Sequence, residues 1–104
     1  MVDVLDAIES WRKAGQRVAV ATVVGVEKSA PRGPGAVLAV NERGDVAGSV
    51  SGGCVEAAVY QEAQDAIATG RARLVVYGIS DADAISVGLT CGGTIHVFVE
   101  RLDW

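Results

Sequence analysis

Apolar residues recur at helical spacing in two stretches of the chain. The first, residues 2–14, repeats its large apolar side chains every three residues and is followed by a glycine stop signal. The residues that share this spacing are Leu5, Ile8 and Trp11. The second stretch begins at Cys54 and ends near Thr69, where Gly70 is placed to form a left-handed cap. The pattern therefore predicts two main helices.

Strand patterns occupy most of the remaining chain. They cover residues 18–24, 36–40, 45–50, 74–77 and 94–100. The first and fourth are continuous apolar runs, typical of strands buried on both faces. The last alternates Ile95, Val97 and Val99 with more polar residues, which predicts two unlike faces. Residues 41–44 have the composition of a hairpin turn.

Strands and helices alternate along the sequence, which predicts the α/β class. We expect a mixed sheet of about five strands, because the hairpin contributes antiparallel pairing. The chain has 104 residues, of which 50% are hydrophobic, so residues 1–104 are predicted to form a single domain.

Hydropathy and the start of the chain argue against a membrane or a secreted protein. The mean hydropathy is +0.32, yet the longest apolar run, residues 18–24, is far shorter than the ~20 residues of a spanning helix. Residues 1–6 lack the basic start and apolar block of a secretion signal. We therefore expect a cytoplasmic protein without a membrane partner.

Charge and metal-ligating residues exclude two further classes. The formal net charge is -4 and the basic residues are scattered, whereas nucleic-acid binding needs a cationic surface. The chain has two cysteines and one histidine, without a compact zinc pattern. Cysteines of a cytoplasmic protein are normally reduced, although the sequence is also compatible with a disulfide between Cys54 and Cys91.

Both cysteines stand beside a pair of glycines. Gly52 and Gly53 precede Cys54 at the predicted start of the second helix, where N–H groups and the helix dipole stabilise an anion such as a thiolate or a phosphate. Cys91 is followed by Gly92 and Gly93, and then by the last strand. Either pair alone fits a tight turn with a buried thiol. Together they favour a ligand site.

Arg32 and Ser51 are further candidates for this site. Arg32 stands in a loop with two prolines and offers planar donors to phosphate or oxo groups. Ser51 offers a hydroxyl, which equally fits a local bond to the backbone. Glu56 is expected to cap the second helix, and His96 is expected to be structural.

Three motifs in this order resemble a known family. They are Ser-Ala-Pro-Arg at residues 29–32, Gly-Ser-Val-Ser-Gly-Gly-Cys-Val-Glu at residues 48–56, and Gly-Leu-Thr-Cys-Gly-Gly at residues 88–93. With the closing apolar strand, they resemble the amino-terminal domain of the XdhC/CoxI family. The resemblance implies an accessory protein of molybdenum hydroxylases such as xanthine dehydrogenase and carbon monoxide dehydrogenase.

What the resemblance implies is a chaperone and maturation factor, not a catalyst. Such proteins bind the molybdenum cofactor, as molybdopterin or its cytosine dinucleotide form, protect it while its sulfido ligand is installed, and hand it to the apo-enzyme. Cys54 and Cys91 become the functional cysteines and the candidate molybdenum contacts. Gly52, Gly53, Gly92, Gly93, Ser51 and Arg32 complete the expected cofactor-binding set.

The same resemblance suggests the partners. They are the target molybdenum hydroxylase, a cysteine desulfurase and a separate Rossmann-like protein, because the family's second, Rossmann-like domain is not among these 104 residues. A homodimer is also expected, since a short domain leaves strand edges to cover.

Two other functions fit the cysteines. One is a persulfide carrier or sulfurtransferase, with Cys54 as nucleophile and Cys91 as resolving thiol. The other is a subunit-interface domain with buried thiols. The carrier hypothesis requires both cysteines to reach one cleft.

Overall fold

The computed structural model describes residues 4–27, 35–50, 55–78 and 94–102, and every structural statement below refers to them. Two helices and five strands follow one another along the chain. They are α1 (Val4–Lys13), β1 (Val18–Glu27), β2 (Val37–Asn41), β3 (Val46–Gly48), α2 (Glu56–Thr69), β4 (Arg73–Gly78) and β5 (Thr94–Leu102). The predicted α/β fold with five strands and two helices is confirmed.

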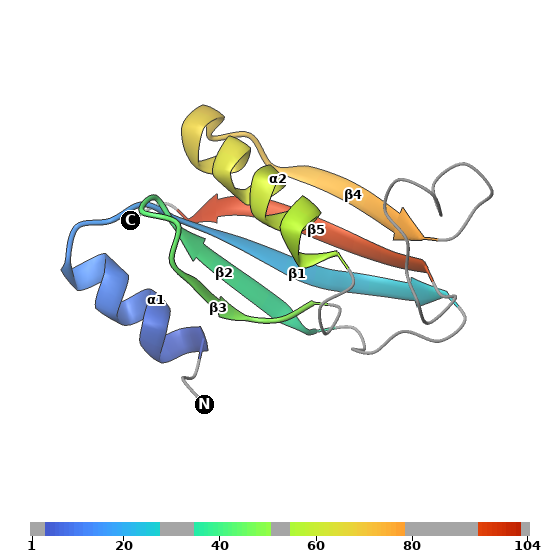
Figure 1. Ribbon diagram of the computed structural model, residues 1–104, viewed down its shortest axis with the longest axis horizontal. Helices are drawn as coiled ribbons and strands as arrows, with labels where there is room; N and C mark the ends of the chain where they lie inside the picture. Colours follow the sequence, from blue (N-terminus) through green and yellow to red (C-terminus); the bar gives the residue numbers. More distant parts are fainter. Residues whose placement is uncertain (1–3, 28–34, 51–54, 79–93, 103–104) are drawn as a thin grey trace.

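The five strands form one sheet in the order β3-β2-β1-β5-β4 (Figure 1). All four pairings between these strands are antiparallel, whereas the sequence predicted a mixed sheet. The helix α2 leads from β3 to β4, which run in the same direction, as in a parallel crossover. These two strands lie at opposite edges of the sheet, however, so they form no parallel pair.

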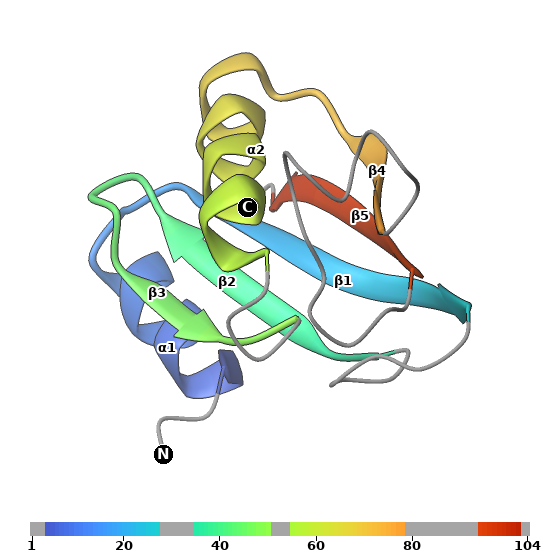
Figure 2. The same cartoon turned by 45° about the vertical axis from the view of Figure 1, so that its right-hand side comes forward.

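The main core lies between the sheet and α2, which crosses one face of it (Figure 2). Alternate residues of β1 and β5 are turned toward the helix and are almost completely buried: Ala19, Ala21, Val23, Ile95, Val97 and Val99. The helix contributes Val59, Ala63, Ala66 and Ile67. The alternation predicted for residues 94–100 is therefore confirmed. Alanines in β1 and α2 let the helix approach the sheet closely.

Only part of the opposite face is covered, because α1 is a short helix that contacts β1, β2 and β3 (Figure 2). Val18 and Ala39 are fully buried there. Val24, Leu74 and Val76 are 54%, 57% and 54% exposed. The prediction that residues 18–24 and 74–77 are buried on both faces is therefore wrong, because α1 does not reach the second half of β1 and β4 is an edge strand.

Local signals set the ends of several elements. Gly70 has φ 73° and donates its N–H to the carbonyl oxygen of Ala66 at 2.8 Å, which confirms the predicted left-handed cap. The predicted hairpin at residues 41–44 is also confirmed, and the buried Asn41 organises it: its Oδ1 accepts hydrogen bonds from the N–H groups of Arg43 and Asp45. In α1, Ala7 is buried, whereas Leu5 is 72% exposed, so the prediction that Leu5 belongs to the buried face of this helix is wrong.

Candidate functional site

The residues predicted to hold the cofactor lie outside the described residues. They are Arg32, Ser51, Gly52, Gly53, Cys54, Cys91, Gly92 and Gly93. Their roles stay predictions. The described residues on either side of them do have defined positions, and these positions show where the motif segments leave the sheet and return to it.

Two of the motif segments start and finish on neighbouring strands. The segment 28–34 follows Glu27, the last residue of β1, and the segment 79–93 connects Gly78 with Thr94. Thr94 is the register partner of both Glu27 and Gly78. Neighbouring strands are about 4.8 Å apart. These three attachment points therefore lie side by side at one end of the sheet (Figure 1).

The strand that precedes the third motif segment points toward the same end without reaching it. The strand β3 runs in the same direction as β1 and β4, but its last residue, Gly48, pairs with Leu38, which in turn pairs with Ala21 in the middle of β1. The segment 51–54 follows shortly afterwards and leads into α2. We call the end of the sheet that is marked by Glu27, Gly78 and Thr94 the loop-bearing end. The strands β1, β3 and β4, which precede the three motif segments, thus all point toward this end of the sheet.

Glu56 ties the two sides of the segment 51–54 together. Its Oε2 accepts a hydrogen bond from the Ser49 hydroxyl at 2.6 Å and another from the Val50 N–H at 3.0 Å. Glu56 is the first residue of α2, where a carboxylate also interacts favourably with the helix dipole. The sequence predicted that Glu56 caps the helix, but the N-cap residue is Val55 and has no side-chain cap hydrogen bond. The two hydrogen bonds of Glu56 described here instead link the helix start back to the strand that precedes the Cys54 motif.

Gly48 is required for the path of the chain into this link. Its φ is +86°, and a side chain would collide with the carbonyl oxygen of Val37 and come within 2.7 Å of the Val4 Cγ2 atom. The next residue, Ser49, donates its N–H to the same Val37 oxygen at 3.0 Å. Gly48 therefore turns the chain between β3 and the Glu56 link. The glycine-rich motif is visible in the sequence, whereas the close approach of Gly48 to the Val37 carbonyl oxygen is not.

Tyr77 places a buried hydroxyl near the loop-bearing end. It precedes Gly78 in β4, packs in the core on the α2 side, and is 5% exposed. Its hydroxyl has no hydrogen-bond partner among the described residues. Burial, and secondarily the negative charge of Glu62, raise the pKa of Tyr77 to about 12. At neutral pH the group is thus an uncharged phenol that can donate a hydrogen bond. The position of Tyr77 at the end of an apolar run gave no sign of this role in the sequence.

Within the described ranges, no group of three or more histidine, cysteine or acidic residues is arranged to hold a metal ion. No helix in those ranges is both long and apolar enough to cross a membrane. His96 is the register partner of Gly25 and Val76 on the face away from α2, so it lies on the opposite side of the sheet from Tyr77. The expected structural role of His96 stays a prediction.

Comparison with known proteins decides the family. The sequence profile of the XdhC and CoxI family matches residues 11–78, which include the first two motif segments and the Glu56 link. The chain belongs to this family. Membership confirms the resemblance seen in the three motifs, although the matched range ends before the segment that contains Cys91.

Relatives of the chain include proteins with informative names. The chain is 37% identical over 89 residues to the molybdenum cofactor insertion chaperone PaoD of Escherichia coli (strain K12), a match that covers 86% of this chain and 28% of the relative. It is 36% identical over 89 residues to a protein of Bacillus subtilis (strain 168) named as a probable subunit of xanthine dehydrogenase, covering 84% of this chain and 27% of that protein.

A solved structure supports the fold. A crystal structure described as a xanthine dehydrogenase from Bacillus halodurans has 33% sequence identity and a TM-score of 0.80, covering 98% of this chain and 31% of that chain. The chain therefore spans less than a third of the length of each of these relatives.

Proposed function

We propose that this chain binds the molybdenum cofactor and delivers it to a molybdenum hydroxylase of the xanthine dehydrogenase type. The observation that carries this proposal is the common direction of β1, β3 and β4, the strands that precede the three motif segments and point toward the loop-bearing end. The names of the relatives supply the cargo and the type of target. The predicted desulfurase, Rossmann-like partner and homodimer belong to the same proposal.

The donors in the three motif segments suit the chemistry of the cofactor. Molybdenum and sulfur match soft thiolate ligands, which Cys54 and Cys91 would provide. The backbone N–H groups of Gly52 and Gly53, which precede α2 in the sequence, would suit the cofactor's phosphate. Arg32 would add a bidentate cation. When bound, the cofactor supplies the molybdenum centre used later by the target enzyme.

Two features of the described residues fit such a ligand. The Tyr77 hydroxyl is a buried polar group without a described partner near the loop-bearing end, so it can donate to an acceptor on the cargo. The Glu56 carboxylate accepts hydrogen bonds from Ser49 and Val50, which offset part of its negative charge. It therefore opposes a phosphate at the start of α2 less than a free carboxylate would.

Gel filtration with released molybdenum cofactor tests the proposal. Wild-type protein is expected to retain the cofactor in its own elution peak, and the Cys54→Ser/Cys91→Ser double variant is expected to lose it. Arg12→Gln is a matched control, because it removes an exposed cation on α1 rather than one near the motif segments. Absence of retention by wild type, or equal retention by the double variant, would contradict the proposal.

Mass spectrometry of the same samples distinguishes a carrier of the molybdenum cofactor from a persulfide enzyme. After incubation with a sulfur donor, a carrier of cofactor is expected to show unmodified cysteines by mass spectrometry. A stable sulfur adduct on Cys54 without cofactor retention would instead favour sulfur transfer.

A further inference from the structure

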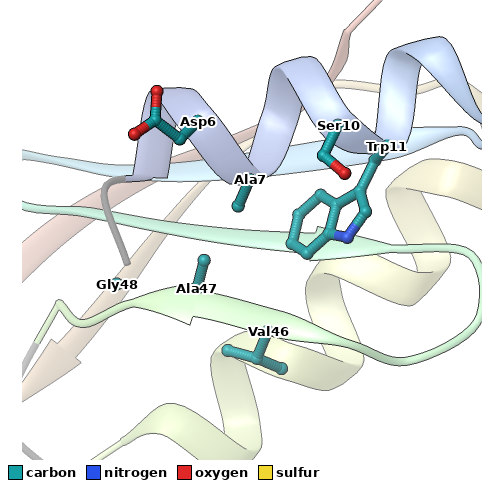
Figure 3. Close-up of a pocket in the computed structure, with 7 residues that line it drawn as sticks. All are labelled: Asp6, Ala7, Ser10, Trp11, Val46, Ala47 and Gly48. Carbon is teal, nitrogen blue, oxygen red and sulfur yellow. The ribbon is translucent and has the colours of Figure 1, made fainter. Parts of the chain in front are cut away.

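A hollow lies between α1 and the edge strand β3. Its volume is about 500 Å³, and it is lined by four residues of α1 and all three residues of β3. Figure 3 shows Ala7 of α1 and Ala47 of β3 facing each other, with the Trp11 ring extending into the space beside them. Small side chains therefore leave room next to an aromatic wall. Ligand pockets commonly have volumes of about 300–1,000 Å³.

The backbone of β3 also faces this hollow. In the antiparallel ladder with β2, the N–H of Asn41 donates to the Asp45 oxygen and that of Ser49 to the Val37 oxygen, each at 3.0 Å. Hydrogen-bonded and non-bonded pairs alternate along such a ladder. Ala47 therefore bonds to β2, whereas the N–H and C=O groups of Val46 and Gly48 point away from it.

We propose that this groove binds an extended peptide segment of a partner protein, which adds to the sheet along the outer edge of β3. The outward backbone groups of Val46 and Gly48 would form the new ladder, as in other cases of strand addition beside a helix. An apolar side chain of the peptide would pack against Trp11 and the two alanines that face each other across the groove.

Charge specifies the peptide further. Among the described residues that line the hollow, Asp6 is the only charged one. A lysine or arginine next to the apolar residue of the peptide would therefore find a complementary carboxylate. The chain has a formal net charge of -4, so a second copy is acidic overall and complements Asp6 less well than a basic segment does. The groove thus favours a basic, extended segment over self-association.

The position of the groove links it to the chain that leads into the Cys54 segment. Gly48 lines the hollow, and the next two residues donate hydrogen bonds to Glu56. A peptide held along β3 would therefore contact the strand that leads into the Cys54 segment. Only this link rests on the proposed cofactor function, since the groove itself requires no cofactor.

Two short synthetic peptides of alternating valine and threonine, one with a central lysine and one with glutamate at that position, provide the probe. In a titration followed by NMR, the lysine peptide is expected to shift the amide signals of Val46 and Gly48. It is expected to bind about twofold to fivefold more tightly than the glutamate peptide, the range of an exposed ion pair. The Asp6→Lys variant is expected to reverse this preference.

A backbone substitution tests the strand addition directly. Val46→Pro removes an N–H that the ladder with β2 does not use, and proline is tolerated in edge strands. Lysine-peptide affinity is expected to fall about tenfold, the value of one lost hydrogen bond. Val46→Ala is the matched control, because it removes the same side chain and keeps the N–H.

Three results would overturn the inference. The first is unchanged Val46 and Gly48 signals with the lysine peptide in large excess. The second is equal binding by the Val46→Pro and Val46→Ala variants together with an unaltered preference in Asp6→Lys. The third is the same amide shifts on raising the protein concentration without peptide, which would identify a second copy as the occupant. None of these measurements uses the cofactor, so they fail or succeed independently of the proposed function.

Discussion

The Tyr77 hydroxyl provides the sharpest test of the core. Tyr77→Phe removes one oxygen from a side chain that is 5% exposed and has no hydrogen-bond partner among the described residues. An unpaired buried polar group costs roughly 1–3 kcal/mol. The variant is therefore expected to increase the free energy of unfolding by about that amount at neutral pH, while the packing of the ring is retained.

The pH dependence of this effect has a definite sign. The pKa of Tyr77 is about 12 in the folded protein and 10.0 without burial, so the folded state binds the phenol proton more tightly. Its contribution is fully present below about pH 10 and is lost as the pH rises through 12. A shift of two pKa units corresponds to about 2.7 kcal/mol. The stability advantage of Tyr77→Phe is expected to grow by up to this amount between these pH values.

Urea unfolding of both proteins over this pH range measures the effect. The chain contains two tyrosines, so a Tyr60→Phe background leaves Tyr77 as the only phenol for titration by ultraviolet absorbance. A Tyr77→Phe variant that is less stable than wild type at neutral pH would show that the hydroxyl has a partner after all. A phenol that titrates near its ordinary pKa would refute the argument from burial.

Three further predictions concern backbone and charge. Gly48→Ala is expected to lower the free energy of unfolding by more than about 2 kcal/mol in thermal unfolding, because backbone strain at φ +86° adds to a collision of the new side chain. The control Gly15→Ala, at φ +76°, meets no atom within 4 Å and is expected to lower it by about 1 kcal/mol. Equal losses in the two variants would contradict the collision. Glu56→Ala is expected to lower the free energy of unfolding in urea by about 1.5–3 kcal/mol, and Glu56→Gln is expected to lower it less, because glutamine keeps one acceptor oxygen. An unchanged urea midpoint for the alanine variant would contradict a stabilising link to Ser49 and Val50. Arg73→Ala is expected to lower the free energy of unfolding by less than about 1 kcal/mol, and this loss is expected to decrease with added salt. The reason is that the 3.0 Å ion pair between Arg73 and Glu62 is largely exposed on the arginine side. A larger loss that salt does not change would indicate that Arg73 stabilises the fold by packing.

Parts of the fold that depend on neighbouring residues were predictable from the sequence. The alternation in residues 94–100 predicted β5, because one face of that strand packs on α2 and the other does not. Gly70 predicted the end of α2, since a left-handed cap needs only a glycine in the right place. The hairpin between β2 and β3 followed from its turn residues for the same reason.

Order within the sheet was not predictable in this way. The run at residues 74–77 has the composition of a buried strand, but β4 became an edge strand, and Leu74 and Val76 point to the uncovered face. Residues 18–24 were assigned two covered faces, yet the short helix α1 covers only the beginning of β1. The position of an element relative to others depends on contacts between distant segments, which local patterns do not encode.

In the candidate site, too, residues with a local sequence signal were predictable, and contacts between separate segments were not. Motif residues such as Cys54 and Cys91 were identifiable from residue type and order, and their roles stay predictions. The contacts of Glu56 with Ser49 and Val50, and of Gly48 with Val37, join residues that lie apart in sequence or in different strands. Tyr77 gave no signal, because an aromatic residue at the end of an apolar strand is ordinary. Its importance comes from the lack of a hydrogen-bond partner among the described residues.

The arrangement of strand ends has a consequence for protein engineering. The end of the sheet opposite the loop-bearing end holds the compact turn of residues 42–44 and the cap at Gly70. Insertions there would break defined hydrogen bonds, whereas insertions in the segments 28–34 and 79–93 would lengthen connections whose attachment points are already paired within the sheet. Insertion libraries therefore belong in those two segments, where diversification leaves the scaffold's own turns unchanged.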